Sequence, residues 1–156
     1  MSHSDTGTSL AHKIDMADLP APETGFVATH FITVSDIKRS THFYRDILGG
    51  EVALEGEPTY VKLANTYVVL NVGGGPTDDK PNTVLHPPTG TREVSSFLNL
   101  RVSNIQHYYK EWKNKGAEFL TEPKSHEFEY RCYMKDPDGY LIEVGETKKE
   151  ARQKTH

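Results

Sequence analysis

The sequence predicts an α+β fold built from two tandem βαβββ modules. Two internal repeats support this prediction. Residues 34–37 (VSDI) recur as residues 102–105 (VSNI), 68 positions later, and Tyr60-Val-Lys recurs as Tyr133-Met-Lys, 73 positions later. Both repeats keep their order along the chain, which indicates a duplicated supersecondary unit. A segment rich in glycine and proline, residues 74–92, separates the two copies.

Local sequence signals in the first copy predict each of its elements in turn. An alternating pattern over residues 28–34 predicts a strand. Ser35-Asp36 then provides a helix cap, because an Asp side chain can accept bonds from free backbone N–H groups. The helix begins at Ile37 and ends at Gly49-Gly50. Three further strands are expected over residues 51–55, 59–64 and 67–72.

The second copy repeats this order with a five-residue insertion between Gly116 and Tyr130. A strand over 96–102 leads to the Ser103-Asn104 cap, and the helix that follows ends at Gly116. The last strands are expected over 117–121, 128–134 and 140–145. We therefore expect a flexible N-terminal arm (1–24), a single domain (25–147, comprising module one at 25–73, the linker at 74–92 and module two at 93–147), and a charged tail (148–156).

Composition excludes several classes of protein. The chain is 35% hydrophobic and 26% charged, with a formal net charge of −4. It has neither an apolar run of the roughly 20 residues that span a bilayer nor clustered basic residues. We expect no membrane and no nucleic-acid partner, and the absence of a signal-peptide pattern predicts a cytoplasmic protein. Cys132 is the only cysteine. Strand alternation places it under the helix as a packed thiol.

The stretch MKDPDGYLIEVGE, residues 134–146, contains a lone carboxylate in an apolar run. Asp-Pro-Asp-Gly resembles the start of a calcium loop, but an EF-hand needs a Glu at position 12 of that loop. Counting from Asp136, that position is Thr147. The stretch therefore reads as a hairpin turn between two strands, with Glu143 on the second.

The repeat, the opening VSDIKRSTHFYRDILGG and the closing DPDGYLIEV resemble the vicinal oxygen chelate superfamily over about Val27 to Gly145. That superfamily includes glyoxalase I, extradiol dioxygenases, and fosfomycin and bleomycin resistance proteins. The resemblance implies an eight-stranded half-open barrel around a cavity and a homodimer. It also implies a divalent metal in the enzymes, whose last ligand corresponds to Glu143.

The other metal ligands of this pattern are missing. The position equivalent to Glu143 in the first copy, 73 residues earlier, is Leu70, and the first-strand positions are Thr29 and Phe97. His30 follows Thr29, and alternation places it on the helix side unless a β-bulge turns it inward. The candidate metal ligands are thus Glu143 and His30. A divalent metal is possible, but this ligand set is incomplete, and the cofactor is unknown.

Alternation also predicts which side chains share the cavity with Glu143. They are Thr29, Phe31, Thr33, Tyr60, Phe97, Asn99, Arg101 and Tyr133, a mixture of aromatic and polar groups that is typical of small-molecule sites. Arg101 would pair either with a carboxylate of the ligand or with Glu143 itself. A buried Glu143 without a metal could act as the catalytic base for enolisation.

Two functions from different classes follow. The first is a glyoxalase-like protein that binds a small organic molecule in its cavity, and its catalytic version is a proton-transfer enzyme of the lyase or isomerase type with an altered or absent metal site. If it is an enzyme, the resemblance implies chemistry like that of glyoxalase (lactoylglutathione lyase) or of a dioxygenase. The second is a metal-free protein that sequesters a drug or metabolite, as bleomycin resistance proteins do. A regulatory or scaffolding module remains a third alternative.

Overall fold

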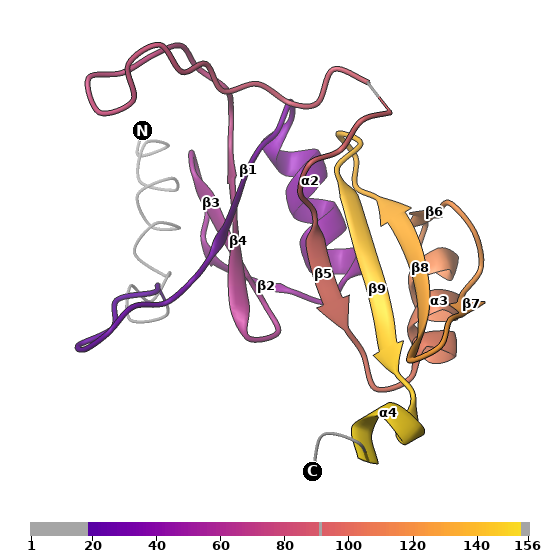
Figure 1. The fold of residues 1–156 in the computed structure, drawn as a ribbon. Helices are drawn as coiled ribbons and strands as arrows, with labels where there is room; N and C mark the ends of the chain where they lie inside the picture. The colour runs from indigo at the N-terminus through magenta and orange to yellow at the C-terminus, as the bar shows by residue number, and fades with distance from the viewer. Residues whose placement is uncertain (1–18, 91, 154–156) are drawn as a thin grey trace, which may run out of the picture. The chain divides into compact units, whose positions relative to one another are not determined.

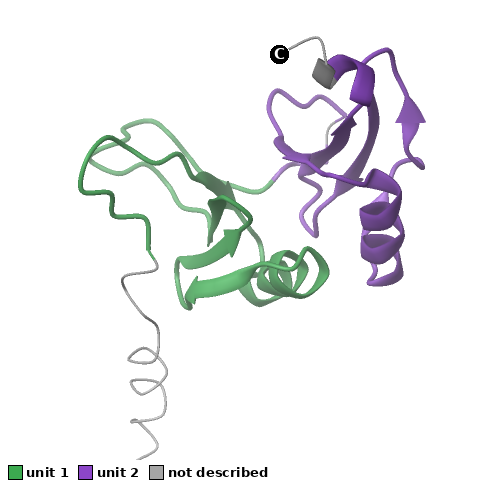
Figure 2. Cartoon of the chain, turned by 90° about the horizontal axis from the view of Figure 1, so that it is seen from below, with its two compact units in different colours: residues 1–87 green, residues 88–156 purple. Residues whose placement is uncertain are grey.

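We describe the chain from a computed structural model, which covers residues 19–90 and 92–153. Most of the predicted N-terminal arm, residues 1–18, lies outside the described residues. The chain divides into two compact units, residues 1–87 (unit 1) and 88–156 (unit 2), shown in Figure 2. This boundary falls inside the predicted linker, so each unit contains one copy of the repeat.

Unit 1 forms one open sheet with a helix on one face (Figure 1). Its elements are β1 (His30–Thr33), α2 (Ile37–His42), the π-helical turn η2 (Phe43–Ile47), β2 (Glu51–Leu54), β3 (Thr59–Leu63) and β4 (Thr66–Asn71). The strand order is β1-β4-β3-β2. β1 pairs parallel with β4, and the other pairs are antiparallel.

The helix of unit 1 begins and ends where its sequence requires. The Asp36 side chain accepts a hydrogen bond from the backbone N–H of Arg39 at 3.1 Å, which satisfies a free donor of the first turn. The helix continues through η2 to Gly49, whose φ of 87° suits glycine. The sheet face beneath the helix carries Val61, Val68 and Leu70, all fully buried.

Unit 2 has the same arrangement with additional pieces. Its elements are β5 (Leu98–Arg101), α3 (Ile105–Asn114), β6 (Glu118–Phe119), β7 (Lys124–Ser125), β8 (Glu129–Lys135), β9 (Leu141–Thr147) and α4 (Lys149–Gln153). The strand order is β5-β9-β8-β6, and β7 also pairs with β8. Again the first strand, β5, pairs parallel with the last, β9.

The core of unit 2 lies between this sheet and α3. Asn104 caps α3 by accepting from the N–H of His107, as Asp36 does for α2. Ile142, Val144 and Cys132 are almost fully buried on the covered face of the sheet, and Trp112 of α3 is also buried. Burial raises the pKa of the Cys132 thiol to about 11, in keeping with a packed cysteine.

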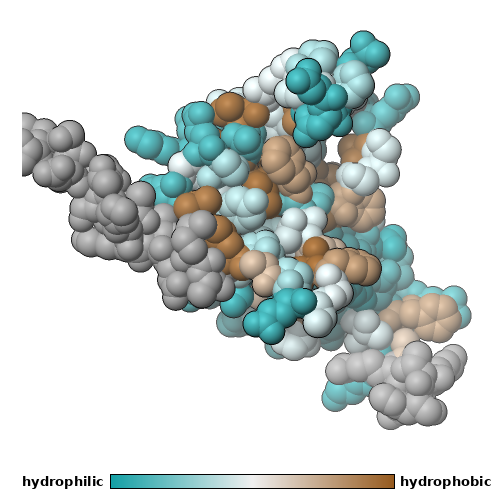
Figure 3. All heavy atoms as spheres, turned by 90° about the vertical axis from the view of Figure 1, so that its left-hand side faces the viewer, coloured by the Kyte–Doolittle hydropathy of each residue, from teal (hydrophilic) through white to brown (hydrophobic). Residues whose placement is uncertain are grey.

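The fold confirms the α+β class and leaves one part of the prediction unconfirmed. The strands form two open sheets and neither sheet closes on itself, so the eight-stranded barrel is not confirmed. Two short elements, β7 and α4, were not predicted. No helix within residues 19–90 and 92–153 is long and apolar enough to cross a membrane. On the surface, apolar side chains occur in several groups among polar ones (Figure 3).

Candidate functional site

The candidate site lies on the face of the unit 2 sheet that α3 does not cover, which we call the open face. The pairing register of the strands determines which residues lie side by side, in rows, across this face. Asn99 of β5 and Tyr133 of β8 both pair with Glu143 of β9. The next row joins Arg101, Gly145 and Arg131. Because side chains alternate along each strand, these two rows point to the same face.

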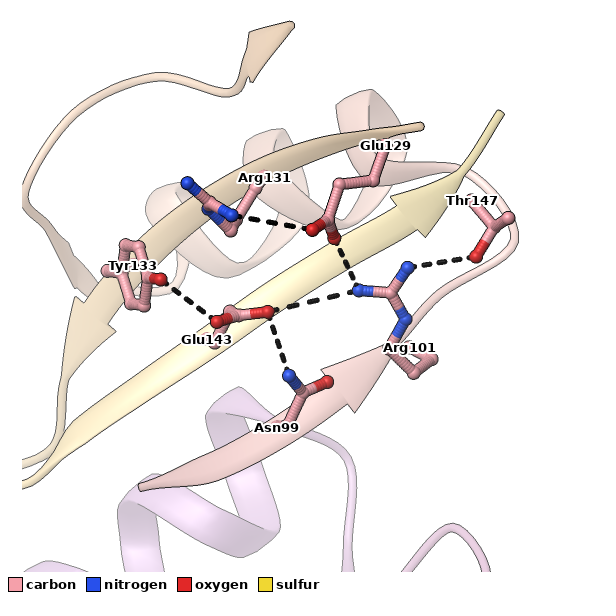
Figure 4. A network of polar contacts seen from close by, with 7 residues as sticks. All are labelled: Asn99, Arg101, Glu129, Arg131, Tyr133, Glu143 and Thr147. Carbon is pink, nitrogen blue, oxygen red and sulfur yellow. Dashed lines mark hydrogen bonds and ion pairs between the residues drawn. The ribbon is translucent and has the colours of Figure 1, made fainter. Parts of the chain in front are cut away.

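Glu143 lies at the centre of this face with only 8% of its surface exposed (Figure 4). One carboxylate oxygen accepts a hydrogen bond from the Asn99 side-chain amide at 2.8 Å. The other accepts from the Tyr133 hydroxyl at 2.9 Å. Both oxygens of this buried carboxylate are therefore satisfied by neutral donors of the protein itself.

Arg101 was predicted to pair with Glu143 or with a ligand, but its main partner is Glu129. Its Nη1 lies 2.7 Å from Glu129 Oε1 and 3.9 Å from the nearest oxygen of Glu143. Its Nη2 donates to the Thr147 hydroxyl at 2.9 Å. The guanidinium group thus bridges two carboxylates, and the hydrogen bond from Arg101 lowers the pKa of Glu129.

Gly145 makes this arrangement possible. A Cβ atom at this position would overlap the Arg101 guanidinium and lie 2.9 Å from the Glu129 carboxylate. The Arg101–Glu129 pair therefore lies directly over the strand, in the space that a larger residue would fill. Sequence reasoning did not predict this role for Gly145.

An aromatic pair borders the polar network. Phe97 meets Tyr133 edge to face with 5.9 Å between ring centres, and 41% of Phe97 is exposed. Burial, followed by the hydrogen bond to Glu143, raises the pKa of the Tyr133 hydroxyl. Tyr133 therefore remains a proton donor to Glu143 across the neutral pH range.

The other predicted site residues belong to unit 1. Phe31 and Tyr60 pair with Val69 on the uncovered face of the unit 1 sheet, and Thr33 occupies the next row with Asn71. Thr29 precedes β1. His30 pairs with Val68 in a row that faces α2, and burial lowers its pKa. No β-bulge turns His30 toward the uncovered face.

The register also corrects the position equivalent to Glu143. Asn99 and Tyr133 correspond in the repeat to Phe31 and Tyr60, and both of these pair with Val69, not with Leu70. The loop between β8 and β9 has five residues, whereas that between β3 and β4 has two. Glu143 follows its partner Tyr133 by ten positions, whereas Val69 follows its partner Tyr60 by nine, so the true equivalent shifts by one position. Leu70 is buried on the helix-covered face.

The residues present do not fit the divalent metal that the resemblance implies. Glu143 already accepts from Asn99 and Tyr133, and the fixed positive charge of Arg101 lies 3.9 Å away. A metal ion would have to displace these donors and would be repelled by Arg101. The repeat equivalent of Glu143 in unit 1 is Val69, whose side chain has no atom that can bind a metal. Among the described residues, no three His, Cys, Asp or Glu side chains group closely enough to hold a metal.

Unit 1 contains a pocket of about 670 Å³ that shares no residue with the predicted site. It lies between the start of α2 and the turn joining β2 to β3, and Val72 forms part of its wall. The hydroxyls of Thr41 and Thr59 in its lining donate to backbone carbonyls of the same unit. These two hydroxyls are thus engaged within the protein.

Sequence comparison identifies the class of protein that this fold and site define. Residues 25–144 match the Glyoxalase/Bleomycin resistance protein/Dioxygenase superfamily, and the chain therefore belongs to it. Among characterised relatives, it is 25% identical over 118 residues to the metallothiol transferase FosB of Staphylococcus epidermidis. That match covers 72% of this chain and 75% of the relative.

Solved structures with a similar fold come from several bacteria. An integron cassette protein from the mobile metagenome of V. cholerae has a TM-score of 0.61 at 21% identity, covering 81% of this chain and 98% of that one. TnmS3, an antibiotic-binding protein from Streptomyces sp. CB03234, has a TM-score of 0.59 at 19% identity, covering 82% and 100%. The fosfomycin resistance protein FosX from Listeria monocytogenes has a TM-score of 0.60 at 14% identity, covering 83% and 98%. These likenesses show the fold alone.

Proposed function

We propose that this protein binds a small organic molecule at the open face of unit 2, around Glu143, without a resident metal ion. The observation that carries the proposal is the state of Glu143: it is buried, and both of its oxygens accept from protein donors. A carboxylate held in this way is a fixed acceptor within a polar wall, and Arg101, 3.9 Å away, already offsets part of its charge without a metal ion.

The surroundings of Glu143 support binding of an organic molecule. Phe97 and Tyr133 offer aromatic surface beside a small number of well-placed polar groups, which is the usual make-up of a ligand site. A protein with a similar fold provides an example of such a role, since TnmS3 is an antibiotic-binding protein. On this proposal the chain sequesters or carries its ligand unchanged, and the homodimer expected from the sequence is part of the same proposal.

A second candidate function is proton-transfer catalysis of the glyoxalase type. The contact between Glu143 and the Tyr133 hydroxyl favours it, because a carboxylate and a phenol in direct contact can exchange roles as proton acceptor and donor. In this alternative Glu143 takes a proton from a carbon next to a carbonyl of the ligand. Tyr133, which keeps its own proton because its pKa is raised, then donates to the developing oxyanion.

A fragment screen by NMR tests the first candidate on the full chain. Hits are expected to shift the backbone amides of β5, β8 and β9, with the same affinity in the presence of a chelator and in the presence of added zinc, nickel or manganese. Hits that bind only when metal is added would overturn the metal-free proposal. A screen in which no fragment shifts these amides would overturn the location of the site.

Glu143→Gln separates binding from catalysis. Glutamine keeps the size of the side chain and accepts with its carbonyl oxygen, but it is a poor base. If the protein only binds, the variant retains affinity within a few-fold of the wild type and no fragment is converted by either protein. If it is an enzyme, turnover of a substrate falls by about 100-fold or more. Glu111→Gln, on α3 at the opposite side of the sheet, is the matched control and is expected to change neither quantity.

A further inference from the structure

Arg131 is a cationic group of the open face whose hydrogen-bond donors are little used. Arg101 donates to both Glu129 and Thr147. Arg131 has a single, long contact of 3.4 Å to Glu129, whose other oxygen is already bonded to Arg101. A guanidinium group carries five N–H donors. Within the described residues, most of the donors of Arg131 therefore lack a protein acceptor.

Arg131 is nevertheless held in place. Only 32% of its side chain is exposed, and the central carbon of its guanidinium group lies 5.9 Å from the centre of the Tyr133 ring. An arginine that packs on an aromatic ring loses less freedom when it binds a ligand than an extended surface lysine does. Its free donors are thus partly oriented before a ligand arrives.

Apolar surface adjoins these donors. The face of Tyr133 continues to Phe97, which is 41% exposed. On the other side of Tyr133, Leu120 is 52% exposed, and its backbone N–H donates to the Tyr133 carbonyl. The open face therefore places an exposed aromatic and aliphatic patch next to a cation that needs an acceptor.

Resting on the proposed function, we infer that the ligand of this site is a flat organic acid. Its carboxylate or similar anionic group accepts the paired N–H donors of Arg131, and its ring packs on Tyr133 and Phe97. An organic cation would compete with the donors that Glu143 and Glu129 already accept from, and it would lie beside the positive charges of Arg101 and Arg131. A neutral ligand would cover Arg131 and leave its donors unsatisfied, which costs affinity.

Three molecules of nearly identical shape test this inference: 2-naphthoate, 2-naphthamide and 2-naphthylmethylamine. Each is titrated into the full chain at low salt while the backbone amides of β5, β8 and β9 are followed by NMR. We expect the acid to bind about 10-fold or more tightly than the amide, because a charge-assisted pair to arginine is replaced by a neutral contact. We expect the amine to bind most weakly.

Variants assign the preference to Arg131. Arg131→Gln is expected to weaken naphthoate binding about 10-fold and to leave naphthamide almost unchanged. Arg131→Lys keeps the charge without the two-pronged geometry, and we expect it to recover part of the affinity. Lys110→Gln, an exposed position on α3, which covers the opposite face of the sheet, is the control and should alter naphthoate binding less than about two-fold. Circular dichroism checks that every variant is folded.

The outcomes separate this inference from the proposed function. If the amide or the amine binds as tightly as the acid while the same amides shift, the ligand class is wrong and the binding face stands. The ligand class is also wrong if Arg131→Gln and Arg131→Lys both remain folded and bind naphthoate normally. If no naphthyl compound and no fragment of the wider screen shifts these amides, the proposed function fails together with the inference.

Discussion

The two units carry the same fold but opposite chemistry on their uncovered faces. In unit 2 the central row is Asn99, Glu143 and Tyr133, joined by hydrogen bonds. In unit 1 the equivalent row is Phe31, Val69 and Tyr60. A buried carboxylate is stable only where its donors are built beside it. One copy of the repeat therefore has a polar centre, and the other has apolar packing at the same position.

A second difference lies where each helix begins. In unit 2 the Glu146 carboxylate accepts from the backbone N–H of Ile105 at 2.8 Å. The equivalent of Glu146 in unit 1 is Val72, which lines the 670 Å³ pocket and has no acceptor on its side chain. The same strand end thus closes the start of the helix in one copy and leaves a hollow in the other. The units differ mainly where one carboxylate is present or missing.

Placing a carboxylate in unit 1 is the test of this difference with the largest expected effect on stability. Val69→Glu is expected to destabilise the protein by about 3 kcal/mol, because Val69 is buried beside Phe31 and gains only the Tyr60 hydroxyl as a donor. Adding Phe31→Asn rebuilds the row of unit 2. A double-mutant cycle in urea should show a favourable coupling of about 1 kcal/mol. Additive effects would mean that the row does not act as a unit.

The reverse change in unit 2 should have a smaller effect. Glu143→Val leaves the Asn99 amide and the Tyr133 hydroxyl without their acceptor, at a cost of about 1–2 kcal/mol because both donors can still reach water. Trp112 is the only tryptophan and lies in unit 2, so its fluorescence in urea measures this effect. An increase in the free energy of unfolding would contradict the view that Glu143 satisfies these two donors.

Exchanging the residues at the helix start gives the next effect. Glu146→Val removes the acceptor of the Ile105 N–H and should destabilise unit 2 by about 1 kcal/mol. Val72→Glu places an acceptor near the start of α2 and should stabilise unit 1 by a few tenths of a kcal/mol. Hydrogen exchange at the amides of each helix reports the two changes separately. If the two substitutions change stability by equal amounts in opposite directions, the pocket beside Val72 does not alter the effect of a carboxylate at the helix start.

Acid should affect the two units through different groups. The Arg101 bond lowers the pKa of Glu129 below its ordinary value of 4.5, so the stability it gives unit 2 is complete above that pH and is lost as the pH falls through the lowered pKa. Arg101→Gln should flatten this loss. Burial lowers the pKa of His30 below 6.5, so the unfolded chain binds the proton more readily and unit 1 loses stability as the pH falls below 6.5.

Urea titrations between pH 7 and pH 4 test this difference. His30→Gln should remove the loss that starts near pH 6.5 and leave the Trp112 signal of unit 2 unaffected. If His30→Gln changes nothing in unit 1, the buried histidine does not control its acid response.

The sequence predicted the elements well where a local signal marked them. Asp36 and Asn104 indicated both helix starts, and both side chains cap as expected. The repeat could not show the longer loop between β8 and β9, because counting residues does not reveal where an insertion lies. For this reason the equivalent of Glu143 was placed at Leu70 and not at Val69. Register is set by pairing between strands, which a single sequence does not display.

The candidate site was predicted in part for the same reason. Alternation correctly grouped Asn99, Tyr133 and Glu143 on one face of unit 2. It would also place Glu129 and Arg131 there, four and two positions before Tyr133, but their role depends on Arg101, 28 residues from Glu129. The need for Gly145 follows from that contact. Long-range pairs of this kind become visible only when the strands are laid side by side.

Because Cys132 is buried, the reaction rate of its thiol can be used to measure the opening of unit 2. The thiol is 1% exposed and belongs to unit 2, and the whole chain has no other cysteine. An alkylating reagent can reach it only when α3 separates from the sheet, so the rate of labelling in native buffer measures how often that unit opens. A ligand that binds to the opposite face of the same sheet should slow the labelling in proportion to its occupancy.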